Sequence, residues 1–192
     1  MKTKFFTRKG DGGQTRVGSK EVFKGDLVFD LLGSLDELNS WLGACRVAAE
    51  KNFYSRRDLR LVIDIFQVVK NIQNSLFIVQ AEIAAVAFGY ARKNKIGPAK
   101  VKFLEELIKK IDRAVPPIKK FIVPGGSELS VYLDYGRALA RRAERLAHLY
   151  NGEKQLPKNL LSFLNRLSSM LFALARYANF ALGIKEENPN YK

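Results

Sequence analysis

Apolar residues repeat at intervals of three and four along most of this chain, which is the spacing of one face of an α-helix. The clearest run places apolar side chains at Leu61, Ile65, Val68, Ile72, Leu76, Val79, Ile83 and Val86. No segment alternates between apolar and polar residues for long enough to require a sheet. The pattern therefore predicts an all-α fold in which each helix buries one apolar stripe against its neighbours.

Local start and stop signals divide this pattern into helices. Ser34 followed by Glu37 fits a capping box, so the first helix is expected to begin at Ser34. Pro116-Pro117 should end the third helix, and Gly183 should close the last. The expected helices span residues 34–49, 57–91, 98–115, 127–152 and 157–182. Long helices with short connections predict an antiparallel five-helix bundle.

The first 33 residues differ from the rest, because they are rich in glycine and charge and have few periodic apolar positions. They are expected to form an irregular, glycine-rich loop or short extended structure. The predicted organisation is an N-terminal segment at 1–33, a helical bundle domain at 34–184 and a frayed C-terminal tail at 185–192.

The 192-residue chain carries a formal net charge of +14. Such a charge favours an anionic partner, which could be nucleic acid, an anionic membrane or a small phosphate-rich substrate. The lysines and arginines are scattered along helical segments, so nucleic acid is not the expected partner. No run of about 18 apolar residues exists, and no membrane-spanning helix is expected.

The single cysteine and single histidine argue against a zinc site of the usual composition, and no metal-ligating set is predicted. Cys45 lies in an apolar stretch and is expected to be a buried, unreactive thiol. The N-terminus has no hydrophobic signal region, so a reducing, cytoplasmic setting is expected.

A Pro-Gly-Gly turn at 124–126 opens a helix with two chemically different faces. At about 100° per residue, one face carries Arg137, Arg141, Glu144 and His148. The opposite face carries Leu139, Ala143, Leu146 and Tyr150. Guanidinium groups bind phosphate oxygens bidentately and keep their charge at any working pH. The charged face is therefore either a solvated surface or a phosphate-binding site, and this helix alone does not distinguish them.

Two further segments leave similar alternatives open. Residues 7–15 combine glycines, hydroxyls and cations, as in a phosphate-binding loop, but lack the Walker A pattern and could equally form a flexible terminus. The last predicted helix is apolar nearly all round. Its narrow polar stripe consists of Asn165, Ser169, Arg176 and Asn179. Buried polar groups need partners, so the stripe indicates either an interhelical hydrogen-bond network or the wall of a ligand pocket.

Three sequence motifs that follow one another in a fixed order identify a protein family more specifically than any one motif alone. They are residues 7–15 with Lys24 downstream, residues 33–39 (Gly-Ser-Leu-Asp-Glu-Leu-Asn), and the Pro-Gly-Gly turn followed by Arg-Arg-Ala-Glu-Arg at 141–145. Residues 164–168 and 174–179 follow in the same order. Over nearly its whole length the chain resembles the ATP:cob(I)alamin adenosyltransferases of the propanediol-utilisation type. The resemblance implies a homotrimer of five-helix bundles with active sites between subunits.

The resemblance also implies the activity. Enzymes of this family bind ATP with Mg²⁺ and take reduced cobalamin as substrate; the cobalt(I) centre attacks C5′ of the ribose, giving adenosylcobalamin and triphosphate. Such a reaction needs charge stabilisation on the phosphates and positioning of C5′, and no general base. The single histidine and the lack of a Ser-His-Asp set agree with this requirement.

Site residues follow from the matching positions. The resemblance implies an ATP-binding loop containing Thr7, Arg8, Lys9, Gly10, Thr15 and Lys24. It implies further nucleotide contacts from Arg141, Arg142, Glu144, Arg145 and Asn165. Asp36 and Arg137 would form an ion pair between subunits, and Phe121 would displace the lower axial base of cobalamin. The expected catalytic residues are therefore Asp36, Phe121, Arg137 and Arg141.

The sequence departs from the family pattern at several positions. Lys9 stands where threonine is usual, Val28 and Leu32 replace an arginine and a tyrosine, and Ser169 replaces an aspartate. The pocket thus loses an acid and gains a base, so a weakly active or inactive relative that binds and delivers a corrinoid is the alternative. A basic nucleic-acid binder is a third hypothesis, based only on net charge. A cobalamin reductase is the candidate protein partner.

Overall fold

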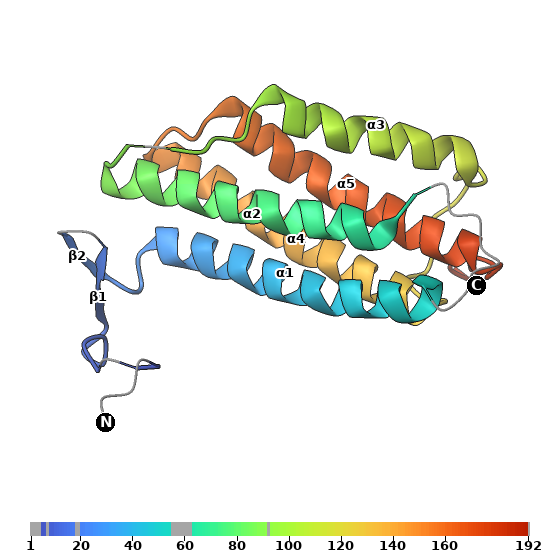
Figure 1. Ribbon diagram of the computed structural model, residues 1–192, viewed down its shortest axis with the longest axis horizontal. Coiled ribbons are helices and arrows are strands. Elements are labelled where there is room, and N and C mark those ends of the chain that lie inside the picture. The colour runs from blue at the N-terminus through green and yellow to red at the C-terminus, as the bar shows by residue number, and fades with distance from the viewer. Residues whose placement is uncertain (1–4, 7, 18–19, 55–62, 92, 192) are drawn as a thin grey trace.

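The computed structural model describes residues 5–6, 8–17, 20–54, 63–91 and 93–191. Within these ranges the chain forms five long α-helices that lie side by side and run alternately in opposite directions (Figure 1). They are α1 (Leu27–Ala49), α2 (Ile65–Phe88), α3 (Pro98–Ala114), α4 (Glu128–Glu153) and α5 (Lys158–Ala181). A π-helical turn, η1 (Glu50–Tyr54), continues α1. The prediction of an antiparallel five-helix bundle is confirmed.

Helix α5 is largely buried in the bundle. It packs against both α3 and α4, while α1 packs against α4 and α2. Its buried side chains include Phe163, Leu167, Leu171 and Leu174. This position explains the apolar composition of α5, because neighbouring helices cover more than one of its faces.

Helix α1 begins earlier than predicted, at Leu27 with Asp26 before it. Ser34 lies inside the helix and is buried, so the predicted N-cap at Ser34 is wrong. The apolar stripe of α1 extends back through Val28 and Leu31, both buried in the core. Helix length in proteins depends mainly on packing of the apolar face, and here packing outweighs the capping-box signal.

Helix α2 begins at Ile65, and the side chain of Asp64 accepts a hydrogen bond from the backbone N–H of Gln67 at 3.1 Å. The predicted start, Arg57, lies outside the described residues. The helix ends before the predicted Ala91, because Gly89 adopts a left-handed conformation with φ of 76°.

The remaining helix boundaries lie close to their predicted positions. Pro98 occupies the first turn of α3, which ends before Pro116-Pro117. The Ser127 hydroxyl caps α4 by accepting from the backbone N–H of Ser130 at 3.1 Å. Gly183, with φ of 69°, follows the end of α5.

The glycine-rich N-terminal segment forms a small antiparallel hairpin of β1 (Gln14–Val17) and β2 (Lys20–Phe23). Gln14 pairs with Phe23 in this register. The hairpin, together with residues 5–6 and 8–13, projects from one end of the bundle (Figure 1) and is called the arm below. Short extended structure was expected here, and the division of the chain into domains stays a prediction.

The C-terminal tail is held by hydrogen bonds, so the prediction that it frays is wrong for residues 186–188. Directly before the predicted tail, the backbone N–H of Ile184 donates to Asn179 O at 2.9 Å. Further along, Val123 N–H donates to Glu187 O at 2.9 Å, and the Asn188 amide donates to Phe121 O at 2.8 Å. The tail thus pairs with the segment that precedes α4.

Cys45 is fully buried, and burial raises the pKa of its thiol to about 12. Because the thiolate is the reactive form, the prediction of a buried, unreactive cysteine is confirmed. In the part of the chain that the structure describes, no helix has the length and apolar character needed to cross a membrane.

The Pro-Gly-Gly turn is locked against α5 by Asn179. The Asn179 Oδ1 accepts from the backbone N–H and the hydroxyl of Ser127, at 2.9 and 3.0 Å. Its amide donates to Gly125 O at 2.9 Å. Gly126 has φ of 97°, and a Cβ there would lie 2.5 Å from Asn179 Oδ1. Only glycine combines that backbone conformation with so close an approach.

We therefore expect Gly126→Ala to lower the free energy of unfolding by about 1–3 kcal/mol, measured by urea denaturation. Gly125→Ala is the matched control, because a Cβ at Gly125 meets no atom within 4 Å and its φ is not positive. Equal losses in the two variants would contradict the role given to Gly126.

Candidate functional site

A cavity of about 1100 Å³ opens between the segment before α4, helices α4 and α5, and the C-terminal tail. The segment before α4 contributes Ile118, Lys119, Lys120, Phe121, Ile122 and Pro124. The helices contribute Arg137, Arg141, Ser168, Ser169 and Phe172. The tail contributes Asn188, Pro189 and Tyr191. This volume lies slightly above the range of about 300–1,000 Å³ that is usual for small-molecule sites.

The lining combines apolar surface with positive charge. The Phe121 side chain is 80% exposed and Tyr191 is 82% exposed, although both are large aromatic residues. The charged lining residues are Lys119, Lys120, Arg137 and Arg141, and none of the described lining residues is a carboxylate. Such a cavity suits a large ligand with a flat apolar part and negative charge.

The predicted charged face of α4 is confirmed. Ala143 and Tyr150 are buried, whereas Arg141 and His148 are exposed. Arg137 Nε donates to Asp134 Oδ1 at 3.0 Å on the same helix. Asp36 is exposed on α1, and because one copy of the chain is described, its pairing with Arg137 of another copy stays a prediction.

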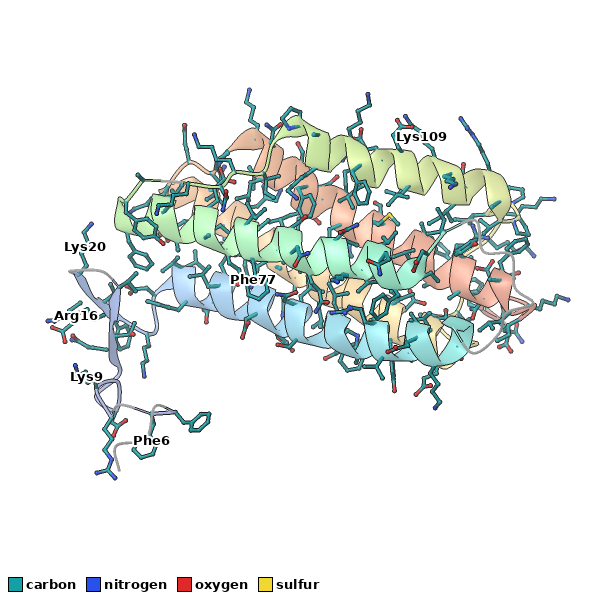
Figure 2. All side chains as sticks on the ribbon, in the orientation of Figure 1. Phe6, Lys9, Arg16, Lys20, Phe77 and Lys109 are labelled. Carbon is teal, nitrogen blue, oxygen red and sulfur yellow. The ribbon has the colours of Figure 1, made fainter. Side chains whose placement is uncertain are left out.

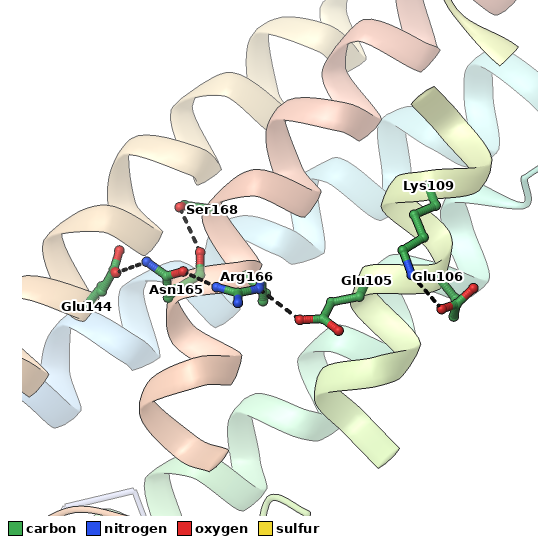
Figure 3. A network of polar contacts seen from close by, with 7 residues as sticks. All are labelled: Glu105, Glu106, Lys109, Glu144, Asn165, Arg166 and Ser168. Atoms are coloured by element: carbon green, nitrogen blue, oxygen red, sulfur yellow. Dashed lines mark hydrogen bonds and ion pairs between the residues drawn. The ribbon is translucent and has the colours of Figure 1, made fainter. Parts of the chain in front are cut away.

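Two predicted nucleotide-binding residues on different helices meet in a polar network (Figure 3). The Asn165 amide donates to Glu144 Oε1 at 2.6 Å, which joins α5 to α4. Arg166 donates to Asn165 Oδ1, and its Nε donates to Glu105 Oε1 of α3 at 3.0 Å. The chain of contacts fixes the orientation of the Asn165 amide, and its contact with a nucleotide stays a prediction.

The other two arginines of the α4 block have different surroundings. Arg142 forms an ion pair with Glu37 of α1. Arg145 is exposed, and its Nη1 donates to Arg141 O at 3.3 Å. Both arginines therefore lie on the outer surface of α4, and their contacts with a nucleotide stay predictions.

Lys24 organises the predicted loop of the arm. Its Nζ donates to Gly10 O at 2.6 Å, and its backbone N–H donates to Gly13 O at 2.9 Å. Arg8 has φ of 61°, and its guanidinium lies 5.5 Å from the centre of the Phe6 ring.

The remaining loop residues lie in or beside the hairpin. Lys9 is exposed, and Thr15 is half-buried in β1. Thr7 lies outside the described residues. Figure 2 shows the labelled Phe6, Lys9 and Arg16 on the arm, well away from the body of the bundle.

The polar stripe of α5 contains both features that the sequence left open as alternatives. Ser169 is exposed and lines the cavity. Asn165 is exposed outside the cavity lining and makes the interhelical hydrogen bond to Glu144 of α4. Arg176 and Asn179 are buried, and their separate hydrogen bonds go to irregular segments, namely the C-terminal tail and the segment before α4.

Sequence reasoning missed part of the lining, mainly Lys119, Lys120, Ser168, Phe172, Asn188, Pro189 and Tyr191. The two lysines directly precede Phe121 and could have been suspected from that adjacency. The tail residues carried no comparable signal, because their place depends on hydrogen bonds to a segment more than 60 residues away in sequence.

The fold and cavity define a helical bundle with a cationic, partly apolar ligand site, and comparison with known proteins gives the family. The cobalamin adenosyltransferase family matches residues 5–178. The chain belongs to this family.

Individual relatives agree over nearly the full length. A corrinoid adenosyltransferase of Bacillus subtilis is 33% identical over 94% of this chain and 89% of its own. The human corrinoid adenosyltransferase MMAB is 34% identical over 96% of this chain and 72% of its own. A variant of the PduO-type ATP:corrinoid adenosyltransferase from Lactobacillus reuteri, complexed with cobalamin and ATP, superposes with a TM-score of 0.84 at 33% identity. That alignment covers 97% of this chain and 99% of the other.

Proposed function

We propose that this protein transfers the 5′-deoxyadenosyl group of ATP to the cobalt of a reduced corrinoid. A cobalt–carbon bond forms with the electron pair of cobalt(I), the C5′–O bond breaks, and triphosphate leaves with the bonding pair. The observation that carries the proposal is the cavity, whose exposed Phe121 and Tyr191 and whose lining of four cations without a carboxylate among the described lining residues suit a corrin ring beside a polyphosphate. Family membership supports the same assignment.

The proposed ATP site combines two groups of residues. On the bundle, Arg141, Arg142, Arg145 and the Glu144–Asn165 pair would hold the nucleotide. On the arm, the loop of Thr7, Arg8, Lys9, Gly10, Thr15 and Lys24 would enclose the triphosphate. Backbone N–H groups of a glycine-rich loop and fixed guanidinium groups stabilise charge on a leaving triphosphate without reorganising during the reaction.

The position of the arm supports an active site shared between copies of the chain. The arm projects at the end of the bundle where α1 begins, whereas the segment before α4 and the tail lie at the opposite end (Figure 1). In a single copy, the arm and the segment before α4 therefore lie at opposite ends of the bundle (Figure 1). The proposed homotrimer would let the arm of one copy reach the cavity of the next, with Asp36 and Arg137 paired across that interface.

On the corrinoid side, Phe121 would displace the lower axial base of cobalamin without itself binding the cobalt. Its ring is exposed in the free protein, and its carbonyl is bonded to the Asn188 amide, so the aromatic group is presented on a fixed backbone. Removal of an axial ligand makes cobalt(II) easier to reduce. The proposed role of Phe121 is therefore to assist formation of cobalt(I).

Mg²⁺ is expected to accompany ATP. The described residues contain no group of three or more His, Cys, Asp or Glu side chains placed to hold a metal ion. Mg²⁺ in nucleotide sites is commonly held by substrate phosphates, water and few protein carboxylates, so this composition fits an ion that arrives with the nucleotide. When bound, Mg²⁺ would neutralise charge on the phosphates.

Delivery of a corrinoid with little turnover is the second candidate, and one observation favours it. Ser169, which stands where relatives usually have aspartate, lies in the cavity lining. The loss of that acid changes the charge next to the ligand. The cytoplasmic setting and the reductase partner stay predictions for either function.

An anaerobic assay with MgATP and chemically reduced cobalamin tests the main proposal. We expect the visible spectrum of the corrinoid to convert to that of adenosylcobalamin, with one triphosphate released per turnover. Tight corrinoid binding without product would favour the delivery role. If the protein neither binds the corrinoid nor forms product, both proposed functions are refuted.

Replacement of Arg141 by alanine is expected to reduce kcat/KM by about a hundredfold or more, because a guanidinium is lost from the proposed triphosphate site. The measurement is the same spectral assay, with the oligomeric state checked by size-exclusion chromatography. Arg113→Ala, which removes an exposed arginine of α3 outside the cavity, should leave activity unchanged. Near-normal activity in Arg141→Ala would remove this residue from the site.

Replacement of Phe121 by alanine should slow the reaction more when it starts from cobalt(II) with a reductase than when it starts from pre-reduced cobalt(I). The reason is that the proposed role of the ring lies in the reduction step. Phe103→Ala, at an exposed phenylalanine of α3, is the matched control. Equal losses from both starting states would contradict the axial role.

A further inference from the structure

Arg176 is a buried charged residue of α5 to which the proposed reaction gives no task. Its side chain is only 6% exposed. A guanidinium keeps its charge when buried and requires close anionic or carbonyl partners. Arg176 does not line the large cavity, so its partners indicate what it does.

Those partners belong to two different irregular segments. Arg176 Nε and Nη2 each donate to one carboxylate oxygen of Glu186, both at 2.8 Å, which is a bidentate pair. Nη2 also donates to Pro116 O at 2.8 Å. One guanidinium therefore joins the C-terminal tail to the start of the segment that leads into α4.

These same two segments supply the wall of the cavity that faces α4 and α5. Beyond Pro116 lie Phe121 and Ile122, and beyond Glu186 lie Asn188 and Tyr191. The segments are also bonded to each other, through Val123 with Glu187 and Phe121 with Asn188. The Arg176–Glu186 pair thus anchors the unit that presents Phe121.

We propose that Arg176 and Glu186 are positioning residues for corrinoid binding. The inference rests on the proposed function and adds a pair that lies outside the cavity lining. Phe121 has an exposed side chain, so its place depends on its backbone and on the tail that bonds to it. Without the Glu186 carboxylate, the tail loses its buried anchor, and the wall that receives the corrin ring shifts.

The proposed role of Arg176 and Glu186 affects corrinoid binding and not ATP binding. Within the described part of the chain, the side-chain hydrogen bonds of Arg176 and Glu186 join these two residues to each other and to the Pro116 carbonyl, and none reaches the arm, Arg141 or the Glu144–Asn165 pair. Loss of the anchor should therefore weaken corrinoid binding and leave ATP binding intact. A purely structural ion pair would instead lower stability without distinguishing the substrates.

The test compares wild type with Glu186→Ala and with Glu186→Gln, which keeps the shape and one hydrogen bond. We expect Glu186→Ala to raise the KM for the corrinoid by about tenfold, with the KM for ATP unchanged and Glu186→Gln intermediate. In the presence of ATP, the visible spectrum of cobalt(II) cobalamin bound to Glu186→Ala should also show less displacement of the lower axial base than the spectrum with wild type. Glu106→Gln, at an exposed carboxylate paired with Lys109, is the control and should change neither KM (Figure 3).

Parallel shifts in both KM values, or a lower Tm with unchanged KM for the corrinoid, would overturn the positioning role. The wild-type reaction keeps this test separate from the proposed function. If the wild type adenosylates the corrinoid and Glu186→Ala has the same KM for the corrinoid, only the role of the pair is refuted. A wild type without product and without corrinoid binding refutes the function, and the pair's role with it.

Discussion

The burial of α5 is the constraint on which the rest of the structure depends. A helix enclosed by two neighbours must satisfy its polar side chains inside the protein, because an unpaired buried polar group costs about 1–3 kcal/mol. Asn179 meets this requirement through the Pro-Gly-Gly turn, and Arg176 through Glu186 and the Pro116 carbonyl. The same contacts that complete the core therefore place the loop and tail that surround the cavity.

The cavity and the arm show how this protein distributes its positive charge. Four cations line the cavity without a carboxylate among the described lining residues, and further cations lie on the arm at the other end of the bundle. Cations held apart in one copy avoid mutual repulsion, and in the proposed homotrimer a second copy would bring them to a shared anion. Assembly would thus supply the charge that a triphosphate leaving group requires.

Local patterns predicted what local chemistry controls. The Ser127 cap, the glycine that follows α5 and the two faces of α4 all lie where the sequence placed them. Predictions were wrong where packing between distant segments determines the local structure. Helix α1 extends past Ser34 because the core accepts Val28 and Leu31, and the tail is ordered because its amides and carboxylate meet partners on other segments.

The sequence by itself determined the helical class, the turn that opens α4 and the family, because periodicity, glycine positions and motif order are properties of neighbouring residues. It also indicated Phe121 and Arg141, which the structure brings to one cavity. Only the tertiary structure decided that Arg176 binds Glu186, that the tail forms a wall, and that the arm lies at the far end of the bundle. These features depend on contacts between segments whose separation along the chain leaves no periodic or motif signal.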